Sequence, residues 1–156
     1  MLKIKVVVVD RTKSSFIKEG EIFYLNRLRR YSTPEWLEVK PASPKKSKTV
    51  ENLLDEEGES ITKTLLPRDY VIALDKSGEA YDSEDLAARI QKLSLTHNRL
   101  SFVIGGPLGL STKILTKAQE LFSLSKLTLT HEMSRLLLLE QLYRAFTILN
   151  NEKYHK

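Results

Sequence analysis

One segment of the chain reads Leu100-Ser101-Phe102-Val103-Ile104-Gly105-Gly106-Pro107-Leu108-Gly109-Leu110. Its first half is a short, mostly apolar run typical of a buried strand, and its second half is rich in glycine. Glycines after a strand let a ligand approach the backbone and leave the N–H groups of the following helix free to bind it. The segment therefore predicts a strand, a ligand-binding turn and a helix, with a plain turn as the alternative.

The alternation of strands and helices continues on both sides of this segment. Apolar runs predict strands at 1–9, 36–39, 70–74, 100–104 and 126–129. Helical spacing predicts helices at 13–30, at 49–66, from Ser83 onward, at 111–122 and at 130–150. The residues predicted to cap three of them are Thr49, Ser83 and Thr130. This order predicts a three-layer α/β fold with a mostly parallel sheet, in which ligands bind at the carboxyl ends of the strands.

Size and composition favour one globular domain over residues 1–156, since 41% of the residues are apolar and 29% are charged. The chain has no cysteine, and its three histidines have no metal-ligand spacing, so we expect no metal site. The longest apolar runs fall far short of the ~20 residues that a membrane span needs, and the N-terminus lacks the layout of a signal peptide. We therefore expect a cytoplasmic protein.

The formal net charge is +5, and basic residues are concentrated near the N-terminus. In residues 1–30 the basic residues are Lys3, Lys5, Arg11, Lys13, Lys18, Arg27, Arg29 and Arg30, and the acidic residues are Asp10, Glu19 and Glu21. Such an excess favours a polyanionic partner such as a nucleic acid. The alternative is a basic face that is simply solvated.

Familiar nucleotide-binding and hydrolase motifs are missing from the chain. The glycine segment does not match G-x-G-x-x-G, and it fails as a P-loop because Leu110 follows Gly109 where lysine is required. No G-x-S-x-G motif occurs, which argues against a serine hydrolase. The glycine turn therefore predicts a ligand site of another kind.

The predicted last helix is apolar around more of its circumference than one packing face requires. Its apolar residues are Met133, Leu136 to Leu139, Leu142, Tyr143, Phe146, Ile148 and Leu149. Two interpretations account for this pattern, a central core helix and a homodimer interface. For the interface, charged residues in place of Leu138 and Leu142 would bury unpaired charge and are expected to give monomer or aggregate.

A polar tail follows this helix and ends in Tyr154, His155 and Lys156. An aromatic ring and an imidazole can stack on a nucleic-acid base, while lysine contacts phosphate. The tail therefore predicts a contact with RNA, and a frayed terminus is the alternative.

Four motifs occur together in this order at a characteristic spacing. They are residues 102–110 quoted above, Leu-Ser-Lys-Leu-Thr-Leu-Thr-His-Glu-Met at 124–133, Glu-Gln-Leu-Tyr-Arg-Ala at 140–145 and Tyr-His-Lys at 154–156. With the strand end Ala73-Leu74-Asp75 and the chain length, they closely resemble the RlmH family of SPOUT-class ribosomal RNA methyltransferases. The resemblance covers the whole chain.

This resemblance implies an S-adenosylmethionine-dependent enzyme that methylates N3 of a pseudouridine in large-subunit (23S) ribosomal RNA, in the assembled ribosome. It also implies a homodimer, and a SPOUT-type α/β fold whose C-terminal part forms a trefoil knot. An alternative is a non-catalytic RNA- or ribosome-binding protein with the same fold. A nucleotide-binding regulator is a second alternative, which the missing nucleotide motifs disfavour.

The resemblance also implies the site residues. The cofactor would be bound by Leu74, Gly105, Gly106, Leu124, Ser125, Lys126, Leu127, Thr128 and Leu129. The RNA would be contacted by Arg135, Arg144, Tyr154, His155 and Lys156, with His155 as the first candidate for the group that accepts the proton from N3. A valine at Gly106 is expected to fill space that the cofactor needs.

Two positions depart from the family pattern. Family members often have a glycine-containing turn after the first strand, where this chain has Val9-Asp10-Arg11, and a glycine before the terminal aromatic–histidine pair, where it has Asn151-Glu152-Lys153. Because asparagine tolerates left-handed backbone better than most residues, we expect the bend before the tail to persist.

Overall fold

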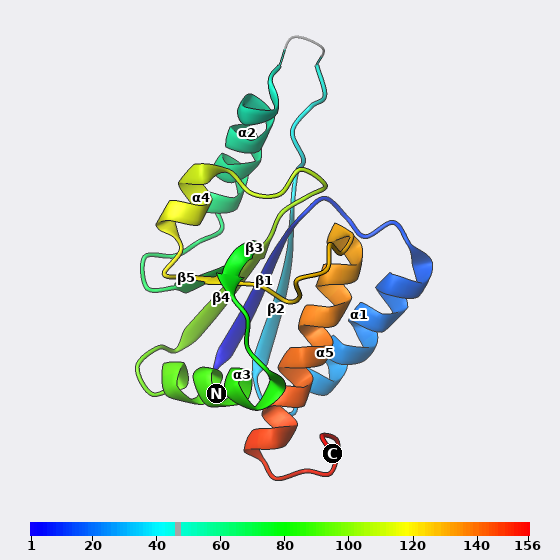
Figure 1. Ribbon diagram of the computed structural model, residues 1–156, viewed down its shortest axis with the longest axis vertical. Helices are drawn as coiled ribbons and strands as arrows, with labels where there is room; N and C mark the ends of the chain where they lie inside the picture. Colours follow the sequence, from blue (N-terminus) through cyan, green and yellow to red (C-terminus); the bar gives the residue numbers. More distant parts are fainter. Residues whose placement is uncertain (46–47) are drawn as a thin grey trace.

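The computed structural model describes residues 1–45 and 48–156 (Figure 1). Its strands are β1 (Lys3–Val9), β2 (Thr33–Val39), β3 (Tyr70–Glu79), β4 (Arg99–Ile104) and β5 (Glu120–Phe122). Its helices are α1 (Ser15–Leu28), α2 (Val50–Thr62), α3 (Ser83–Ser94), α4 (Thr112–Lys117) and α5 (His131–Leu149). Strands and helices alternate without exception along the described residues, and each strand is followed by a helix.

The strands form one parallel sheet in the order β2-β1-β4-β3-β5. β1 lies inside this sheet with β2 on one side and β4 on the other, and every residue from Ile4 to Val9 is buried. A continuous run of β-branched residues suits such a strand because both of its faces are covered. The prediction of a mostly parallel sheet is confirmed.

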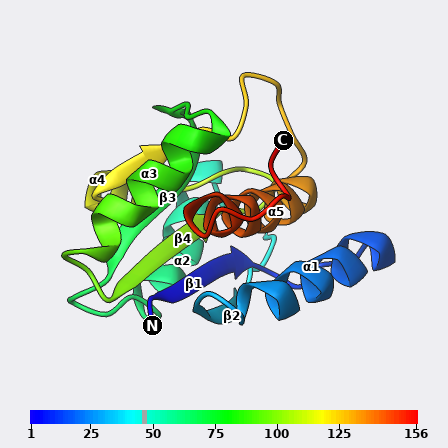
Figure 2. The ribbon, with the colours of Figure 1, turned by 90° about the horizontal axis from the view of Figure 1, so that it is seen from below.

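Helices cover both faces of the sheet. On one face Ile4, Val6 and Val8 belong to a core shared with α1, α3 and α5, and α5 lies between the other two helices (Figure 2). On the opposite face Val7 and Val9 belong to a second core shared with α2 and α4. Because side chains alternate along a strand, one apolar run supplies both cores, and the predicted three layers are confirmed.

Polar side chains cap the helices. Thr49 and Thr130 cap α2 and α5 as predicted. At α3 the cap is Asp82 rather than Ser83, and its carboxylate accepts the N–H of Asp85 at 2.8 Å. An aspartate caps as well as a serine and adds a negative charge near the positive end of the helix dipole, so the predicted start was wrong by one residue.

The helix predicted at 111–122 ends at Lys117, and the last three residues of that range form β5 instead. The apolar spacing continues past Lys117, so the pattern contains no stop signal. Residues 120–122 become a strand because they pair with the free edge of β3. The side-chain oxygen of Gln119 accepts the N–H of Val71 at 2.7 Å, and the backbone N–H of Gln119 donates to the carbonyl of Val71 at 3.0 Å. Sheet pairing here overrides the helical pattern.

The segment predicted as a strand at 126–129 is a loop, because β3 already pairs with β4 on one side and with β5 on the other. The residues Asp75-Lys76-Ser77-Gly78 are of types that predict a turn, but they lie inside β3, which continues to Glu79. At Gly78 the strand crosses β5 so closely that a Cβ atom would stand 2.5 Å from backbone atoms of Leu121 and Phe122. Only glycine permits this crossing.

α5 buries one face completely within its own chain. Leu138 and Leu142 have no exposed surface, so a charge at either position would lie in the core, and the expectation that such charges act at a dimer interface was wrong. Met133, Leu137 and Ile148 lie on the other side of the helix and are only half-buried. The core-helix interpretation therefore holds for the first face and leaves the second available to another surface.

Both departures from the family pattern fall on left-handed backbone. Asp10 has φ 69° and Asn151 has φ 55°. The Asp10 carboxylate accepts the N–H of Arg11 at 2.8 Å, a local bond that stabilises the bend. Aspartate and asparagine are the residues that best tolerate this conformation in place of glycine, so both bends persist.

Candidate functional site

A pocket of about 640 Å³ opens at the carboxyl edge of the sheet. It is built from residues 74–76 of β3, the turn after β4, the loop after β5 and the first turn of α5. The residues expected to bind a cofactor all line it: Leu74, Gly105, Gly106, Leu124, Ser125, Lys126, Leu127, Thr128 and Leu129. They are distant in sequence and close in space because the carboxyl ends of parallel strands share one edge.

The glycine turn is tight. The N–H of Gly109 donates to the carbonyl of Gly106 at 3.0 Å, and Gly109 has a left-handed φ of 85°. A Cβ atom on Gly105 would stand 2.3 Å from the carbonyl oxygen of Gly109, which leaves no room for a side chain. The backbone of this turn therefore forms one wall of the pocket directly.

Gly106 has less crowded surroundings than Gly105. A Cβ atom there would meet Val9 at 3.6 Å and Glu57 at 3.8 Å, both ordinary contacts. A Cβ atom at Gly106 would therefore fit beside the end of β1 and α2. The expectation that a valine there fills space that the cofactor needs stays a prediction, whereas at Gly105 the protein itself leaves no room for a side chain.

The loop from Leu124 to Leu129 belongs to neither a helix nor a strand. Ser123 anchors its start, since its N–H donates to the carbonyl of Glu79 at 2.9 Å and its hydroxyl donates to the carbonyl of Ser125 at 3.1 Å. The hydroxyl of Ser125 then accepts the N–H of Leu127 at 3.0 Å. Because no ladder or helix uses this backbone, its remaining polar groups are available to a ligand.

Two leucines stand at the mouth of the pocket. Leu127 is 76% exposed and Leu108 is 53% exposed. They come from different walls, the loop after β5 and the glycine turn. Exposed apolar side chains beside free backbone groups suit a ligand with a flat apolar ring and polar edges.

His131 and Ser134 also line the pocket, from the first turn of α5, and were not among the predicted site residues. Burial, followed by the nearby charge of Arg135, lowers the pKa of His131 below its ordinary value of 6.5. The ring is therefore neutral at pH 7 and can donate or accept a hydrogen bond. The signal for this placement was its position directly after the Thr130 cap, at the carboxyl edge of the sheet.

Glu132 ties α5 to the loop that follows β1. Its carboxylate accepts the N–H of Lys13 at 2.9 Å and that of Ser14 at 3.0 Å. These bonds, chiefly the one from Lys13, lower the pKa of Glu132 to about 2. The first turn of α5 is thereby fixed to the start of α1.

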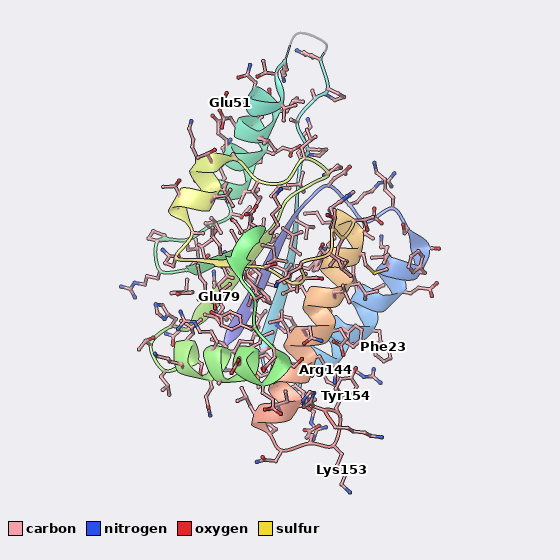
Figure 3. The ribbon with its side chains drawn as sticks, in the orientation of Figure 1. Phe23, Glu51, Glu79, Arg144, Lys153 and Tyr154 are labelled. Atoms are coloured by element: carbon pink, nitrogen blue, oxygen red, sulfur yellow. The ribbon has the colours of Figure 1, made fainter. Side chains whose placement is uncertain are left out.

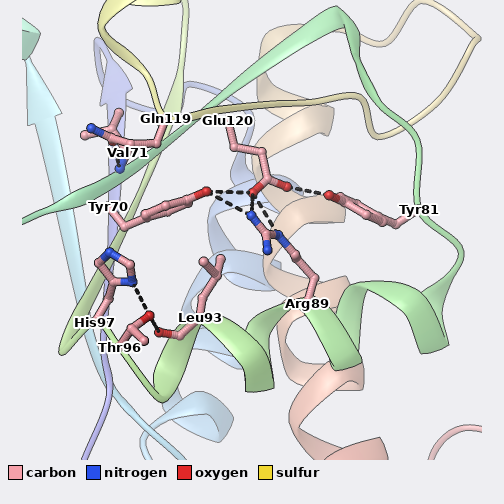
Figure 4. Close-up of polar contacts among 9 residues, drawn as sticks. All are labelled: Tyr70, Val71, Tyr81, Arg89, Leu93, Thr96, His97, Gln119 and Glu120. Carbon is pink, nitrogen blue, oxygen red and sulfur yellow. Dashed lines mark hydrogen bonds and ion pairs between the residues drawn. The ribbon is translucent and has the colours of Figure 1, made fainter.

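β5, which leads into the pocket loop, is held by a cluster of polar side chains (Figure 4). The carboxylate of Glu120 accepts hydrogen bonds from Arg89 at 2.8 and 3.0 Å, from Tyr81 at 2.6 Å and from Tyr70 at 3.2 Å. Arg89 lies on α3 and Tyr70 on β3. This cluster therefore fixes a three-residue edge strand that has few backbone bonds of its own.

Most of the residues expected to contact RNA gather at the far end of α5 (Figure 3). Arg144 forms an ion pair with Glu140 at 2.5 Å, and its guanidinium lies 4.8 Å from the centre of the Tyr154 ring. The Nδ1 atom of His155 is 3.3 Å from Nη1 of Arg144. Lys156, the last residue, is exposed. The tail thus folds back onto the end of its own helix.

This cluster and the pocket are separate within one chain. The pocket lies at the first turn of α5 and the tail follows its last turn, and a helix of 19 residues is about 28 Å long. The structure therefore brings the cofactor residues together but does not bring His155 to them.

Arg135 lies apart from the other expected RNA contacts. Its side chain is fully buried and points to the end of β1 and the following loop. The guanidinium has no path to RNA in this position, so its assignment to the RNA surface does not fit the structure.

Two absences concern residues 1–45 and 48–156. In these ranges no helix is both long and apolar enough to cross a membrane. No group of three or more histidine, aspartate or glutamate side chains there is placed to hold a metal ion.

Comparisons with known proteins bear on this pocket. A family profile described as "Predicted SPOUT methyltransferase" matches residues 2–155. Proteins named ribosomal RNA large subunit methyltransferase H from Thermotoga maritima and Natranaerobius thermophilus are 38% and 42% identical to the chain, over 99% of the chain and 99% of each relative. A solved structure of a probable methyltransferase from Bordetella pertussis Tohama I has a TM-score of 0.56 at 12% identity, covering 93% of this chain and 96% of that one. That last likeness concerns the fold alone.

The family profile and the full-length relatives confirm the resemblance carried by the four motifs. The trefoil knot stays a prediction from the family. The chain belongs to the SPOUT methyltransferase family, in its ribosomal RNA large subunit methyltransferase H group.

Proposed function

We propose that this protein transfers a methyl group from S-adenosylmethionine to N3 of a pseudouridine in large-subunit (23S) ribosomal RNA. The observation that carries the proposal is the pocket in which every expected cofactor residue meets. The names of the relatives support an RNA substrate in the large subunit. In this proposal residues 1–156 act as one domain, on the assembled ribosome in the cytoplasm.

The pocket suits S-adenosylmethionine in size and lining. Its volume of about 640 Å³ falls within the range of roughly 300–1,000 Å³ that small-molecule sites span. Leu108 and Leu127 would cover the adenine ring, and backbone groups of the loop from Leu124 to Leu129 would bind its edge and the sugar. When bound, the sulfonium supplies an electrophilic methyl group.

The protein's own task is to align N3 with that methyl group and to accept the proton that N3 loses. We assign the proton to His155, because an imidazole suits proton transfer near neutral pH. Arg144 and Lys156 would contact RNA phosphates, and Tyr154 would stack on a base. Since Arg144 touches both Tyr154 and His155, it would also orient them.

Because His155 lies at the opposite end of α5 from the pocket of its own chain, the proposal requires a homodimer. The outer side of α5 carries Met133 and Leu137, both half-buried, and α1 beside it exposes Phe16 and Phe23. Antiparallel pairing of two such faces would place the tail of each chain beside the partner's pocket.

The alternative function, a non-catalytic RNA- or ribosome-binding protein, does not need this pocket. Titration calorimetry with S-adenosylmethionine separates the two. Micromolar binding, together with methyl incorporation into ribosomes that lack the modification, supports the enzyme. Protein that binds ribosomes but shows no calorimetric signal with the cofactor supports the alternative.

Mixing a variant impaired in the tail with a variant impaired in cofactor binding, at a cofactor concentration well below the Kd of the second, tests whether the site is shared between subunits. One variant carries His155→Ala and the other carries Gly105→Ala in the pocket. In each homodimer both sites have either a defective tail or a defective pocket. In a mixed dimer one site combines the intact tail of the Gly105→Ala chain with the intact pocket of the His155→Ala chain. Random mixing should therefore restore about a quarter of the wild-type rate per dimer. No recovery, in a sample where exchange of subunits is verified, would show that tail and pocket do not cooperate across the dimer.

A further inference from the structure

A buried chain of polar side chains joins α5, the loop after β1 and α1. Arg135 donates from Nη1 to the hydroxyl of Thr12 at 2.9 Å and from Nη2 to the carbonyl oxygen of Val9 at 2.6 Å. The Thr12 hydroxyl in turn donates to the carboxylate of Glu21, with Oε2 at 2.8 Å. Arg135, Thr12 and Glu21 are all buried. One hydroxyl therefore bridges a buried cation and a buried anion.

The two charges depend on each other. Burial lowers the pKa of Arg135 and raises that of Glu21, and each charge opposes the effect of burial on the other. The remaining charged groups near the guanidinium are Glu132, Glu38 and Asp10. Well-packed apolar residues commonly replace such a pair without loss of stability. In the described ranges Nε of Arg135 also has no hydrogen-bond partner, so stability alone does not account for this arginine.

The position of this chain of side chains suggests its role. Val9 is the last residue of β1, and it lies against Gly106 in the glycine turn. Arg135 is one helical turn beyond His131 and directly follows Ser134, and both of those residues line the pocket from α5. The bonds from Arg135 thus join α5, which forms one wall of the pocket, to the end of β1, which lies against the glycine turn that forms another wall. A shift of α5 against β1 would therefore change the width of the pocket.

We propose that Arg135, held by Thr12 and Glu21, is a positioning residue for the cofactor pocket. It fixes the first turn of α5 against the end of β1, so that His131 and Ser134 face the glycine turn at the correct distance. This inference rests on the proposed function, and it replaces the assignment of Arg135 to the RNA surface.

Two substitutions of Thr12 that differ in the hydroxyl test the inference. Thr12→Val keeps the shape of the side chain and removes the bridge, whereas Thr12→Ser keeps the hydroxyl. We expect Thr12→Val to raise the Kd for S-adenosylmethionine about tenfold, equivalent to about 1.4 kcal/mol, and Thr12→Ser to stay within about twofold of wild type. KM for the cofactor should rise in parallel, while KM for ribosomes should not change.

A matched control separates positioning from general loss of stability. The buried hydroxyl of Ser101 donates to the buried carboxylate of Asp69 at 3.0 Å, and Asp69 is paired with Lys5 at 2.8 Å. Ser101→Ala therefore removes a hydroxyl from a comparable buried ion pair that does not line the pocket. We expect it to lower the melting temperature as Thr12→Val does and to leave the cofactor Kd unchanged.

The outcomes are distinct. Equal cofactor affinity in Thr12→Val and wild type overturns the inference, and so does an equal loss of affinity in Ser101→Ala. If Thr12→Val does not fold, Glu21→Gln, which keeps an oxygen acceptor and removes only the charge, is held to the same expectation. Wild-type protein that does not bind S-adenosylmethionine overturns the proposed function instead.

Discussion

Alanine at Gly105 should distort the cofactor pocket, whereas alanine at the neighbouring Gly106 should not. At Gly105 the added Cβ would stand 2.3 Å from the carbonyl oxygen of Gly109 and 2.5 Å from its carbonyl carbon. Both are backbone atoms that cannot rotate away, and ordinary contact begins at 3.4 Å, so the turn must open by about 1 Å. At Gly106 the nearest atom, on Val9, is already at an ordinary distance of 3.6 Å.

The size of the effect follows from the cost of this opening. Forcing an extra methyl group into a well-packed site costs about 1–3 kcal/mol. If the cofactor binds only to the native form of the turn, the free energy needed to restore that form weakens binding. The dissociation constant then rises tenfold for about each 1.4 kcal/mol. Gly105→Ala should therefore weaken binding by between about 5-fold and 150-fold, and Gly106→Ala by less than about twofold.

Titration calorimetry with S-adenosylmethionine measures both constants, and circular dichroism on the same samples shows whether each variant is folded. The neighbouring glycine is the matched control, because it lines the same pocket and differs only in what its Cβ would meet. Equal affinities for the two variants, whether both normal or both reduced, would refute the steric reasoning.

Three further changes test other parts of the structure. Leu137→Glu, on the outer side of α5, should give folded monomers in sedimentation, whereas Leu142→Glu in the core should unfold the chain. If the Leu137→Glu variant still sediments as a dimer, the proposed interface is contradicted. A chain ending at Lys153 should keep its melting temperature within roughly 3 °C but lose most methyl incorporation into unmodified ribosomes, and a normal rate would remove the tail from the mechanism. Glu132→Gln removes a carboxylate whose folded pKa is about 2, below its ordinary 4.5. Its stabilisation is complete above pH 4.5 and is lost as the pH falls toward 2, so the variant should be less stable than wild type in urea at pH 7 and equal to it near pH 2.

The buried strands were predictable from sequence because their signal is local. The valines of β1 and the apolar run of β4 read as strands without knowledge of their partners, and the caps Thr49 and Thr130 mark helix starts by their own chemistry. β5 was not predictable in this way. Its residues continue a helical pattern, and only the free edge of β3 turns them into a strand.

The residues of the site also divide into those that the sequence identified and those that depend on contacts distant in sequence. The residues expected to bind the cofactor were identified through motifs, and the parallel sheet explains why they line one pocket. The roles of Arg135 and Gly106 could not be read from sequence, because an arginine on a helix gives no sign of which way it points and a glycine gives no sign of what its missing Cβ would touch. The loop at 126–129 has strand spacing but lines the pocket, and at such sites local pattern and structure commonly disagree.

β1 has one neighbour close in sequence and one far away. β2 follows it after a single helix, but β4 begins only at Arg99. While the chain is being synthesised, one edge of a valine-rich strand therefore stays open until about two thirds of the protein has been made. An open apolar edge invites pairing with other chains, and contacts so distant in sequence form slowly. Folding is thus a late event that involves the whole chain, and fragments that stop before β4 should aggregate in the cell instead of accumulating as a stable N-terminal half.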